Sequence, residues 1–428
     1  MRRVAFVSIF LFSTLFANPP ATIEDLFVAL KKSPTTLEDI LKEKDAYKAM
    51  AQKEALLFPK IYGFASYEHY SNPVNVRPLT PTETMSLITT PGSTMPFSQN
   101  LQKFGARFSM PLVNTGLYAA INEAKTNVKS AEAKKNLEFI SKEALLLSYD
   151  MNLKFYETLE EALISQEKSI SKTSERIELG AKNGRYATSD SLKLKSIISQ
   201  IDIALSDTKA KKESVIQSIY AVTGLNIANS VPLRLKKNIN DESLEASLLP
   251  YKLDLKAKEY SYSASVREFY PTLSMEGSVF RGYGDAYNND VRFQRDNGVL
   301  GVYLNVPLFD ASVWQKSQKS RIAELISKNN LEKASLELEA KAKSLKSFED
   351  ELAKEIKTAQ ELIEANEKLL EIAKVSYKNG RMSVEEYLRY EDALFNSKAS
   401  VAGIESGLWN TRGQLALIYG VELSNIVE

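Results

Sequence analysis

Side chains that commonly carry catalysis are scarce in this sequence. Its 428 residues include no cysteine and a single histidine, His69. Thiolate nucleophiles, disulfides and cysteine-ligated zinc are therefore excluded, and one histidine alone cannot build a histidine-based metal site. Paired acids such as Glu160–Glu161 and Glu385–Glu386 are most simply interpreted as solvated helix positions. The sequence thus favours a protein that is not an enzyme and holds neither a cofactor nor a metal ion.

The charge balance and the N-terminus indicate where the chain works. The 55 basic and 54 acidic residues leave a net charge of +1, so the composition does not point to a nucleic-acid partner. Residues 1–17 begin with Arg2 and Arg3, continue as an apolar run and end at Ala17, which is typical of a signal peptide. A membrane anchor is the alternative, but the run is shorter than the ~20 apolar residues of a spanning helix. We therefore expect an exported chain cleaved after Ala17.

Turn residues recur along the chain at a constant offset, which indicates an internal duplication. Three pairs lie 196 positions apart, and these pairs are Gly184 and Gly380, Pro111 and Pro307, and Gly224 and Gly420. Self-similarity at a fixed offset is the signature of a repeated unit. We expect a first repeat over residues 18–232, which contains a 16-residue insertion, and a second repeat over residues 233–428.

Long stretches without proline or glycine predict long helices. Residues 117–179 contain neither, and a helix over them would be about 95 Å long at 1.5 Å per residue. Apolar residues recur every seven positions in both copies, which predicts coiled packing of one helix on another. Shorter helices are expected over residues 188–222 and 383–419, after each long helix. Further helices are expected over residues 22–57 and 241–267, at the start of each copy.

Between the first helix and the long helix of each copy, the apolar pattern becomes alternating. The alternation is clearest over residues 104–110 and 300–306. Such runs, each expected to be about ten residues long, are typical of strands, and we expect one β-hairpin at about residues 60–110 and another at about residues 272–306. The proline-rich stretch over residues 71–100 is expected to form an exposed loop.

Alternating strands of this length, with aromatic residues near their ends, suit a transmembrane β-barrel. A barrel in lipid must be closed, because each unpaired backbone group there costs several kcal/mol. Four strands are too few, so several chains must contribute; two chains would supply eight strands and three would supply twelve. The expected fold class is mainly α with a small membrane β part. It combines duplicated long antiparallel helical hairpins, as in an α-barrel, with four β-strands per chain.

The turn at the far end of each long helix is expected to end one helix and start the next. The glycine of each turn suits the left-handed residue that ends a helix. Ser383 and Glu386 form an S-x-x-E capping box, whereas the first copy has Ala187 and Asp190 at these places and a weaker cap. The turns either serve only to end one helix and start the next, or they are exposed tips that contact a partner. The residues that would dock a partner are Asn183, Gly184, Arg185, Asn379, Gly380 and Arg381.

In these features the chain resembles the TolC family of outer-membrane efflux and secretion channels. The resemblance covers nearly the whole mature chain and includes a proline at each passage from strand to helix, Pro111 and Pro307. It implies a homotrimer with a 12-stranded outer-membrane β-barrel and a long α-helical tunnel in the periplasm. It also implies two partners, a periplasmic adaptor protein and an inner-membrane pump of the RND, ABC or similar type. The chain would be the passive exit duct of a tripartite efflux system or a type I secretion system.

The resemblance also suggests residues that gate the periplasmic end of such a tunnel. Glu386 falls at an acidic ring position of the family, and Asp190 is its counterpart in the first copy. Tyr377 matches the gate tyrosine of the family. Arg381 lies one place before the position of the family's gate arginine. Arg389 occupies a second acidic position and reverses its charge. We expect Glu386 to line the narrow entrance and Tyr377 to help hold it shut.

Two alternatives stay open at this point. A periplasmic coiled-coil adaptor of the membrane-fusion type also has long helical hairpins. Such an adaptor would have lipoyl-like and β-barrel domains around a single hairpin and would not need two strand hairpins of membrane length. The other alternative is a structural coiled-coil protein without a pore.

Overall fold

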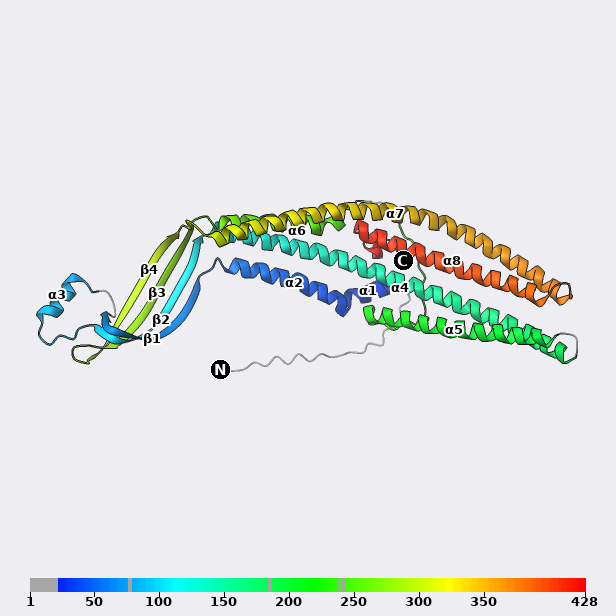
Figure 1. The fold of residues 1–428 in the computed structure, drawn as a ribbon, viewed down its shortest axis with the longest axis horizontal. Helices are drawn as coiled ribbons and strands as arrows, with labels where there is room; N and C mark the ends of the chain where they lie inside the picture. The colour runs from blue at the N-terminus through cyan, green and yellow to red at the C-terminus, as the bar shows by residue number, and fades with distance from the viewer. Residues whose placement is uncertain (1–21, 76–78, 184–186, 238, 240–242) are drawn as a thin grey trace. The chain divides into compact units, whose positions relative to one another are not determined.

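A computed structural model describes residues 22–75, 79–183, 187–237, 239 and 243–428 of the chain (Figure 1). The signal peptide expected over residues 1–17 lies outside the described residues. Within them the elements are α1 Ile23–Lys32, α2 Pro34–Ala55, β1 Lys60–Asn75, α3 Pro81–Thr89, β2 Phe97–Val113, α4 Thr115–Lys182, α5 Thr188–Thr223, α6 Glu245–Arg267, β3 Thr272–Asp285, β4 Arg292–Asn305, α7 Ala311–Lys378, α8 Val384–Tyr419 and a short 3-10 turn, Leu423–Asn425.

Elements of equal length recur in the two halves of the chain. The helices α4 and α7 each contain 68 residues, and α5 and α8 each contain 36. The helices α7 and α8 begin 196 residues after α4 and α5, respectively. The predicted long helix over residues 117–179 is confirmed and extends further at both ends. The apolar positions that recur every seven residues are buried or half-buried, and Ile170 and Ile177 in α4 and Leu352 in α7 are among the buried ones.

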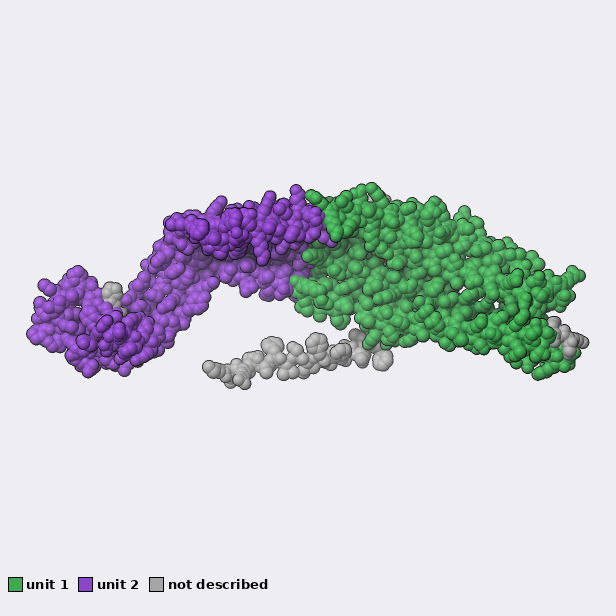
Figure 2. Space-filling model, in the orientation of Figure 1, with its two compact units in different colours: residues 1–42, 132–250, 332–428 green, residues 43–131, 251–331 purple. Residues whose placement is uncertain are grey.

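The chain forms two compact units, which Figure 2 shows in different colours. One consists of residues 1–42, 132–250 and 332–428, and the other of residues 43–131 and 251–331. Both halves of the sequence contribute segments to both units. The compact units are therefore assembled across the sequence repeat and do not coincide with its two copies. The tips of the long helices belong to the first unit and the sheet belongs to the second.

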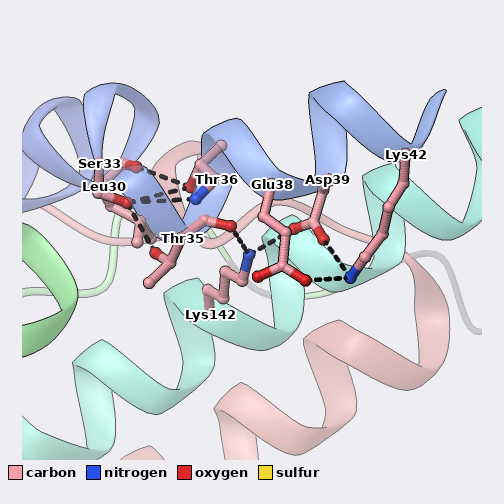
Figure 3. Close-up of polar contacts among 8 residues, drawn as sticks. All are labelled: Leu30, Ser33, Thr35, Thr36, Glu38, Asp39, Lys42 and Lys142. Atoms are coloured by element: carbon pink, nitrogen blue, oxygen red, sulfur yellow. Dashed lines mark hydrogen bonds and ion pairs between the residues drawn. The ribbon is translucent and has the colours of Figure 1, made fainter. Parts of the chain in front are cut away.

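The helix predicted over residues 22–57 is divided into α1 and α2 at Pro34. Ser33 is extended, with φ −70° and ψ 153°, as expected because proline disfavours a helical conformation of the residue before it. The Thr36 hydroxyl donates to the Leu30 carbonyl at 2.7 Å and satisfies an acceptor at the end of α1 (Figure 3). The sequence prediction missed this break because the helical pattern continues on both sides of the proline.

The joint between α1 and α2 is fastened to α4 by one lysine. The Lys142 ammonium donates to the Thr35 carbonyl at 2.6 Å and forms an ion pair with Asp39 (Figure 3). Both charged side chains are largely buried, with 19% and 9% exposed. The N-terminal helices are thereby attached to the first long helix.

The short helices α5 and α8 both end in a left-handed glycine and lead into segments that pair with each other. Gly224 has φ 73° and Gly420 has φ 69°, which is the usual helix-ending conformation. Beyond them, Arg234 and Glu428 exchange backbone hydrogen bonds of 2.8 and 2.9 Å. The buried side chains of the largest apolar cluster come from α1, α4, α5, α8 and these two segments.

The four strands form one antiparallel sheet in the order β1-β2-β3-β4. The two predicted hairpins are confirmed, and β2 pairs with β3 to join them. The strands contain 14 to 17 residues, which is longer than the predicted ten. The expected loop over residues 71–100 also contains the helix α3, which was not predicted. A capping box between Thr80 and Glu83, with Pro81 in the first turn, starts this helix.

Candidate functional site

The tip turn between α7 and α8 is set by backbone geometry. Gly380 has φ 70°, so the predicted left-handed conformation is confirmed. The Arg381 N–H donates to the Ser376 carbonyl at 3.0 Å. The Ser383 hydroxyl accepts from the Glu386 N–H at 3.2 Å, and the Glu386 carboxylate accepts from the Ser383 N–H at 3.1 Å. The predicted capping box is therefore confirmed, and it uses the Glu386 side chain.

The corresponding turn between α4 and α5 is only partly described. Gly184 and Arg185 lie outside the described residues, and Asn183 is exposed. Ala187 begins α5 without a side-chain cap, as predicted. Asp190 is half-buried in the first turn of α5, where its charge favours the positive end of the helix dipole. The two tips therefore differ in their caps.

Near the described tip, an aromatic and acidic cluster joins α4, α7 and α8. Tyr377 of α7 stacks on Tyr387 of α8, with ring centroids 5.1 Å apart and ring planes inclined by 18°. The Arg176 guanidinium of α4 lies 5.9 Å from the Tyr377 ring centroid. Tyr387 donates to Oε1 of Glu391 at 2.5 Å, and the Ser169 hydroxyl of α4 donates to the same oxygen. We call these five residues the tyrosine cluster.

Burial controls the ionisation of the tyrosine cluster. Tyr387 and Glu391 are 5% and 6% exposed. Loss of solvation raises the pKa of Glu391, and it raises the pKa of Tyr387 to about 12. Oε2 of Glu391 is buried without a hydrogen-bond partner in the described part of the chain. The ring stack and hydrogen bonds of this cluster hold α4, α7 and α8 together.

Of the four predicted gate residues, only Tyr377 belongs to the tyrosine cluster. The other three lie in the tip turn or in the first turns of α5 and α8. The sequence prediction missed Tyr387 and Glu391. Their spacing of four places them on one face of a helix, and this spacing was the signal that could have found them.

Beside the tyrosine cluster, side chains of α4, α7 and α8 line a groove of about 920 Å³. The lining is rich in basic residues from all three helices. They are Lys168, Lys172 and Arg176 of α4, Lys368, Lys374 and Lys378 of α7, and Lys398 of α8. Fewer acids line it, namely Glu161, Glu367, Glu371 and Glu391. The groove therefore presents an excess of positive charge.

The two faces of the sheet have opposite character. The strand registers put apolar side chains on one face, and these are Ile61, Phe104, Val279, Leu300, Val302 and Leu304. All six are exposed, including Ile61 at 72% and Leu300 at 71%. The other face is mainly polar and carries half-buried side chains such as Ser66, Glu68, Lys103 and Ser278, with Tyr62, Val299 and Tyr303 as exposed exceptions. This is the reverse of a soluble sheet, whose apolar face is covered and whose polar face is solvated.

At one end of the apolar face, polar and aromatic side chains form a rim. Arg281 pairs with Asp296 through two hydrogen bonds of 2.6 and 2.8 Å. The Tyr67 hydroxyl donates to the Asn100 side chain at 3.1 Å, and His69 lies 2.7 Å from the same amide oxygen. His69 thus contributes to this rim, at the point where the pairing of β1 with β2 shifts register.

The two prolines expected at the strand-to-helix passages occupy different positions. Pro111 lies within β2, where it pairs with Ser274 next to a register shift. Pro307 lies between β4 and α7, outside both elements. A proline cannot donate a ladder hydrogen bond, so the register shift beside Pro111 is the local consequence of its place in a paired strand.

No group of three or more His, Cys, Asp or Glu side chains in the described part is placed to hold a metal ion. Among the described helices, none combines the length and the apolar character needed to cross a bilayer.

Comparison with known proteins identifies the fold. No protein-family model matches the sequence, and no curated protein matches it. The Campylobacter jejuni CmeC outer membrane channel superimposes with a TM-score of 0.77 at 16% identity, over 93% of this chain and 85% of that one. The outer membrane protein VceC from Vibrio cholerae gives 0.76 at 14% identity, over 94% and 99%. The Neisseria gonorrhoeae MtrE outer membrane channel gives 0.74 at 12% identity, over 95% and 90%. The chain therefore has the fold of these outer-membrane channels, as the resemblance to the TolC family predicted.

Proposed function

We propose that the chain is an outer-membrane channel and forms the passive exit duct of a tripartite efflux or type I secretion system. The observation that carries this proposal is the reversed sheet, whose one face exposes apolar side chains and whose other face is mainly polar. Water would make such an apolar face unfavourable, whereas lipid would cover it. The polar face would then line an aqueous passage.

The strand dimensions support a membrane location. A tilted strand needs about 9 to 11 residues to cross a bilayer, and each strand here contains 14 or more. The rim of Tyr67, Arg281 and Asp296 suits the polar boundary of the membrane, where aromatic and charged side chains commonly lie. The extra strand length would project beyond the lipid.

The open edges of the sheet support assembly from several chains. The sheet begins with β1 and ends with β4, and neither outer edge is paired in the described residues. Unpaired backbone in lipid is costly, so the edges of one chain must pair with those of another. Three chains would supply twelve strands around a lumen. Exposed apolar side chains along α7, including Leu336, Phe348 and Ile372, provide further surface for neighbouring chains to cover.

The helix tips are the proposed contact with a periplasmic adaptor, which in turn would engage an inner-membrane pump. Asn379 and Arg381 are exposed at the described tip, and the basic groove lies beside it. A partner that presented acidic side chains would complement this surface.

The tyrosine cluster is the proposed closing joint of the periplasmic entrance. In this cluster Tyr377 stacks on Tyr387. Tyr387 in turn is hydrogen-bonded to the Glu391 carboxyl and to Ser169 of α4. An ion pair of 2.7 Å between Lys193 and Glu385 adds a link from α5 to α8. In planar bilayers, Tyr387→Ala should raise single-channel conductance, because it removes both the ring stack and the hydrogen bond. An unchanged conductance would refute the role of this joint.

Membrane fractionation followed by native mass measurement tests the proposed function itself. The mature chain should fractionate with the outer membrane, require detergent for extraction and have the mass of three copies. A chain that stays monomeric in buffer without detergent would contradict the proposal.

A further inference from the structure

Two acidic side chains of α4 are fully buried, although acids are rarely buried without a partner cation. Glu143 and Asp150 are each 0% exposed. They are seven residues apart, so they lie on the same face of the helix, two turns from each other. Neither participates in the tyrosine cluster, the tip turns or the sheet.

Each of these carboxyls holds one of the two paired segments that follow the short helices. Oε2 of Glu143 accepts from the Leu423 N–H at 2.8 Å. Oδ1 of Asp150 accepts from the Val231 N–H at 3.0 Å. Glu157, two further turns along α4, accepts from the N–H and the hydroxyl of the neighbouring Ser230, at 3.1 and 2.6 Å. The side chains of α4 thus fasten residues 225–236 and 421–428.

The second oxygen of each buried carboxyl has no hydrogen-bond partner among the described residues. Two ionisable groups act on Glu143, namely Glu422, the residue before Leu423, and Lys31 of α1. The Ser424 hydroxyl is also close to Glu143. Around Asp150 they are Lys154 and Glu157 on α4 itself. Loss of solvation outweighs the attraction of Lys31 to Glu143 and of Lys154 to Asp150.

Burial therefore favours the protonated form of both acids. It raises the pKa of Glu143 from 4.5 to about 7, and that of Asp150 from 3.8 to about 7. The backbone hydrogen bonds act in the opposite direction and offset only part of this shift. The pKa of each carboxyl is higher in the folded state than in the unfolded state. The stabilisation of the docked segments by the neutral form is therefore fully present below about pH 4. This contribution declines as the pH rises and is lost above about pH 7.

We propose that Glu143 and Asp150 form a proton-dependent clasp, which holds residues 421–428 and 225–236 on α4 when the two carboxyls are neutral and loosens when they ionise. The opening equilibrium should change by about tenfold per pH unit for each carboxyl that ionises within this range. The clasp is a conformational device in the middle of the helical unit and is separate from the proposed gate.

The second long helix has no equivalent clasp. At the offset of 196, Glu143 corresponds to Glu339 and Asp150 to Lys346. Glu339 is exposed and forms an ion pair of 2.7 Å with Lys343, one turn away on the same helix. Glu339 is therefore a matched control, since it is the same residue type at the same place of the repeat.

Hydrogen exchange of the full mature chain in detergent tests the clasp. The measured quantity is the protection factor of the peptides that contain Leu423 and Val231. A protection factor is corrected for the intrinsic pH dependence of exchange. Between pH 5.5 and 7.5 the wild-type protection should fall by about tenfold or more at each site. In Glu143→Gln the Leu423 peptide should stay protected at both pH values, because the neutral amide oxygen accepts the same bond. Asp150→Asn should do the same for the Val231 peptide.

Two further variants complete the design. Glu339→Gln should keep the wild-type pH profile, and Glu143→Ala should lower the protection of the Leu423 peptide at both pH values. A wild-type profile that is flat with pH would overturn the proposal. A Gln or Asn variant that retained the wild-type pH dependence would overturn it as well.

Discussion

The two long helices α4 and α7 have the same length and the same place in the repeat, but they are packed differently. Large apolar side chains of α4, such as Leu146 and Ile170, are fully buried. In α7 the buried apolar positions are mostly alanines, whereas larger side chains such as Leu336 and Ile372 are exposed at 70% and 64%. One of the two equivalent helices thus organises the core of the chain, and the other leaves large apolar side chains exposed.

The polar anchors differ in the same way. In α4, Lys142, Glu143 and Asp150 fasten segments from the N-terminal part, the C-terminal end and the middle of the sequence, respectively. At the equivalent places α7 has a leucine, the exposed Glu339 and a lysine. The internal polar contacts of the repeat are therefore concentrated on its first copy.

The largest expected difference lies between Ile140 of α4 and its counterpart Leu336 of α7. Ile140 is 3% exposed, so Ile140→Ala should lower the free energy of unfolding by about 2–5 kcal/mol. Leu336→Ala should change the stability of a single chain by less than about 0.5 kcal/mol but weaken association between chains. Urea denaturation and native mass measurement report the two effects. Equal destabilisation of the dissociated chain by both variants would break the comparison.

A second matched pair concerns lysines. Lys142→Ala leaves the largely buried Asp39 without its ion-pair partner and should lower the free energy of unfolding by about 1–3 kcal/mol. Lys343→Ala removes an exposed pair of α7, in which 77% and 53% of the two side chains are exposed. This second change should have an effect of about 0.5 kcal/mol or less. Thermal denaturation of both variants compares them, and a larger effect for Lys343→Ala would contradict the assignment of α4 as the anchor helix.

The caps of the helices that follow α4 and α7 offer a smaller test. Ser383→Ala should destabilise α8 by about 1 kcal/mol, because it removes one side of the capping box. Ala187→Ser in the first copy should stabilise α5 by up to about 1 kcal/mol, since it supplies the missing cap. Hydrogen exchange in the first turns of α5 and α8 measures both changes. A loss of protection in Ala187→Ser would show that this position is not the cap.

A further small effect is expected from Ser169, whose counterpart in α7 is Ala365. Ser169→Ala removes the hydroxyl that donates to Glu391 and should lower the free energy of unfolding by about 0.5–1.5 kcal/mol. The pKa of Glu391 should rise further above its ordinary value, because that hydrogen bond favours the carboxylate. An isotope-edited carboxyl titration measures this shift. A lower pKa in the variant would show that the hydroxyl has a different role.

Much of the fold could be predicted from local patterns. The long helices, the two hairpins, the left-handed Gly380 and the Ser383 capping box each depend on residues close in sequence. The break before Pro34 and the helix α3 were missed, because helical composition on both sides of a proline and a proline-rich stretch gave misleading signals. These errors concern local boundaries and leave the architecture unchanged.

The sites depend on tertiary contacts, and here the sequence was less informative. Tyr377 was identified through a family resemblance, but its partners Tyr387 and Ser169 are brought together only by the packing of three helices. The buried Glu143 and Asp150 look like ordinary helix acids in the sequence. Their role follows from the segments that fold back onto α4 from more than 80 residues away.

The central claim is that several copies of the chain close one β-barrel. Disulfide trapping between the sheet edges of neighbouring copies tests this claim most directly. The sequence contains no cysteine, so a chain with one cysteine at Ala65 of β1 and another on β4, placed in turn from Gln294 to Leu304, has no competing thiols. Bonding requires Cα atoms about 4.4–6.8 Å apart. We predict that oxidation of membranes yields a three-chain species for a narrow set of β4 positions, and that reduction returns it to single chains. If no β4 position links one chain to another, the sheet edges do not meet and the account is wrong.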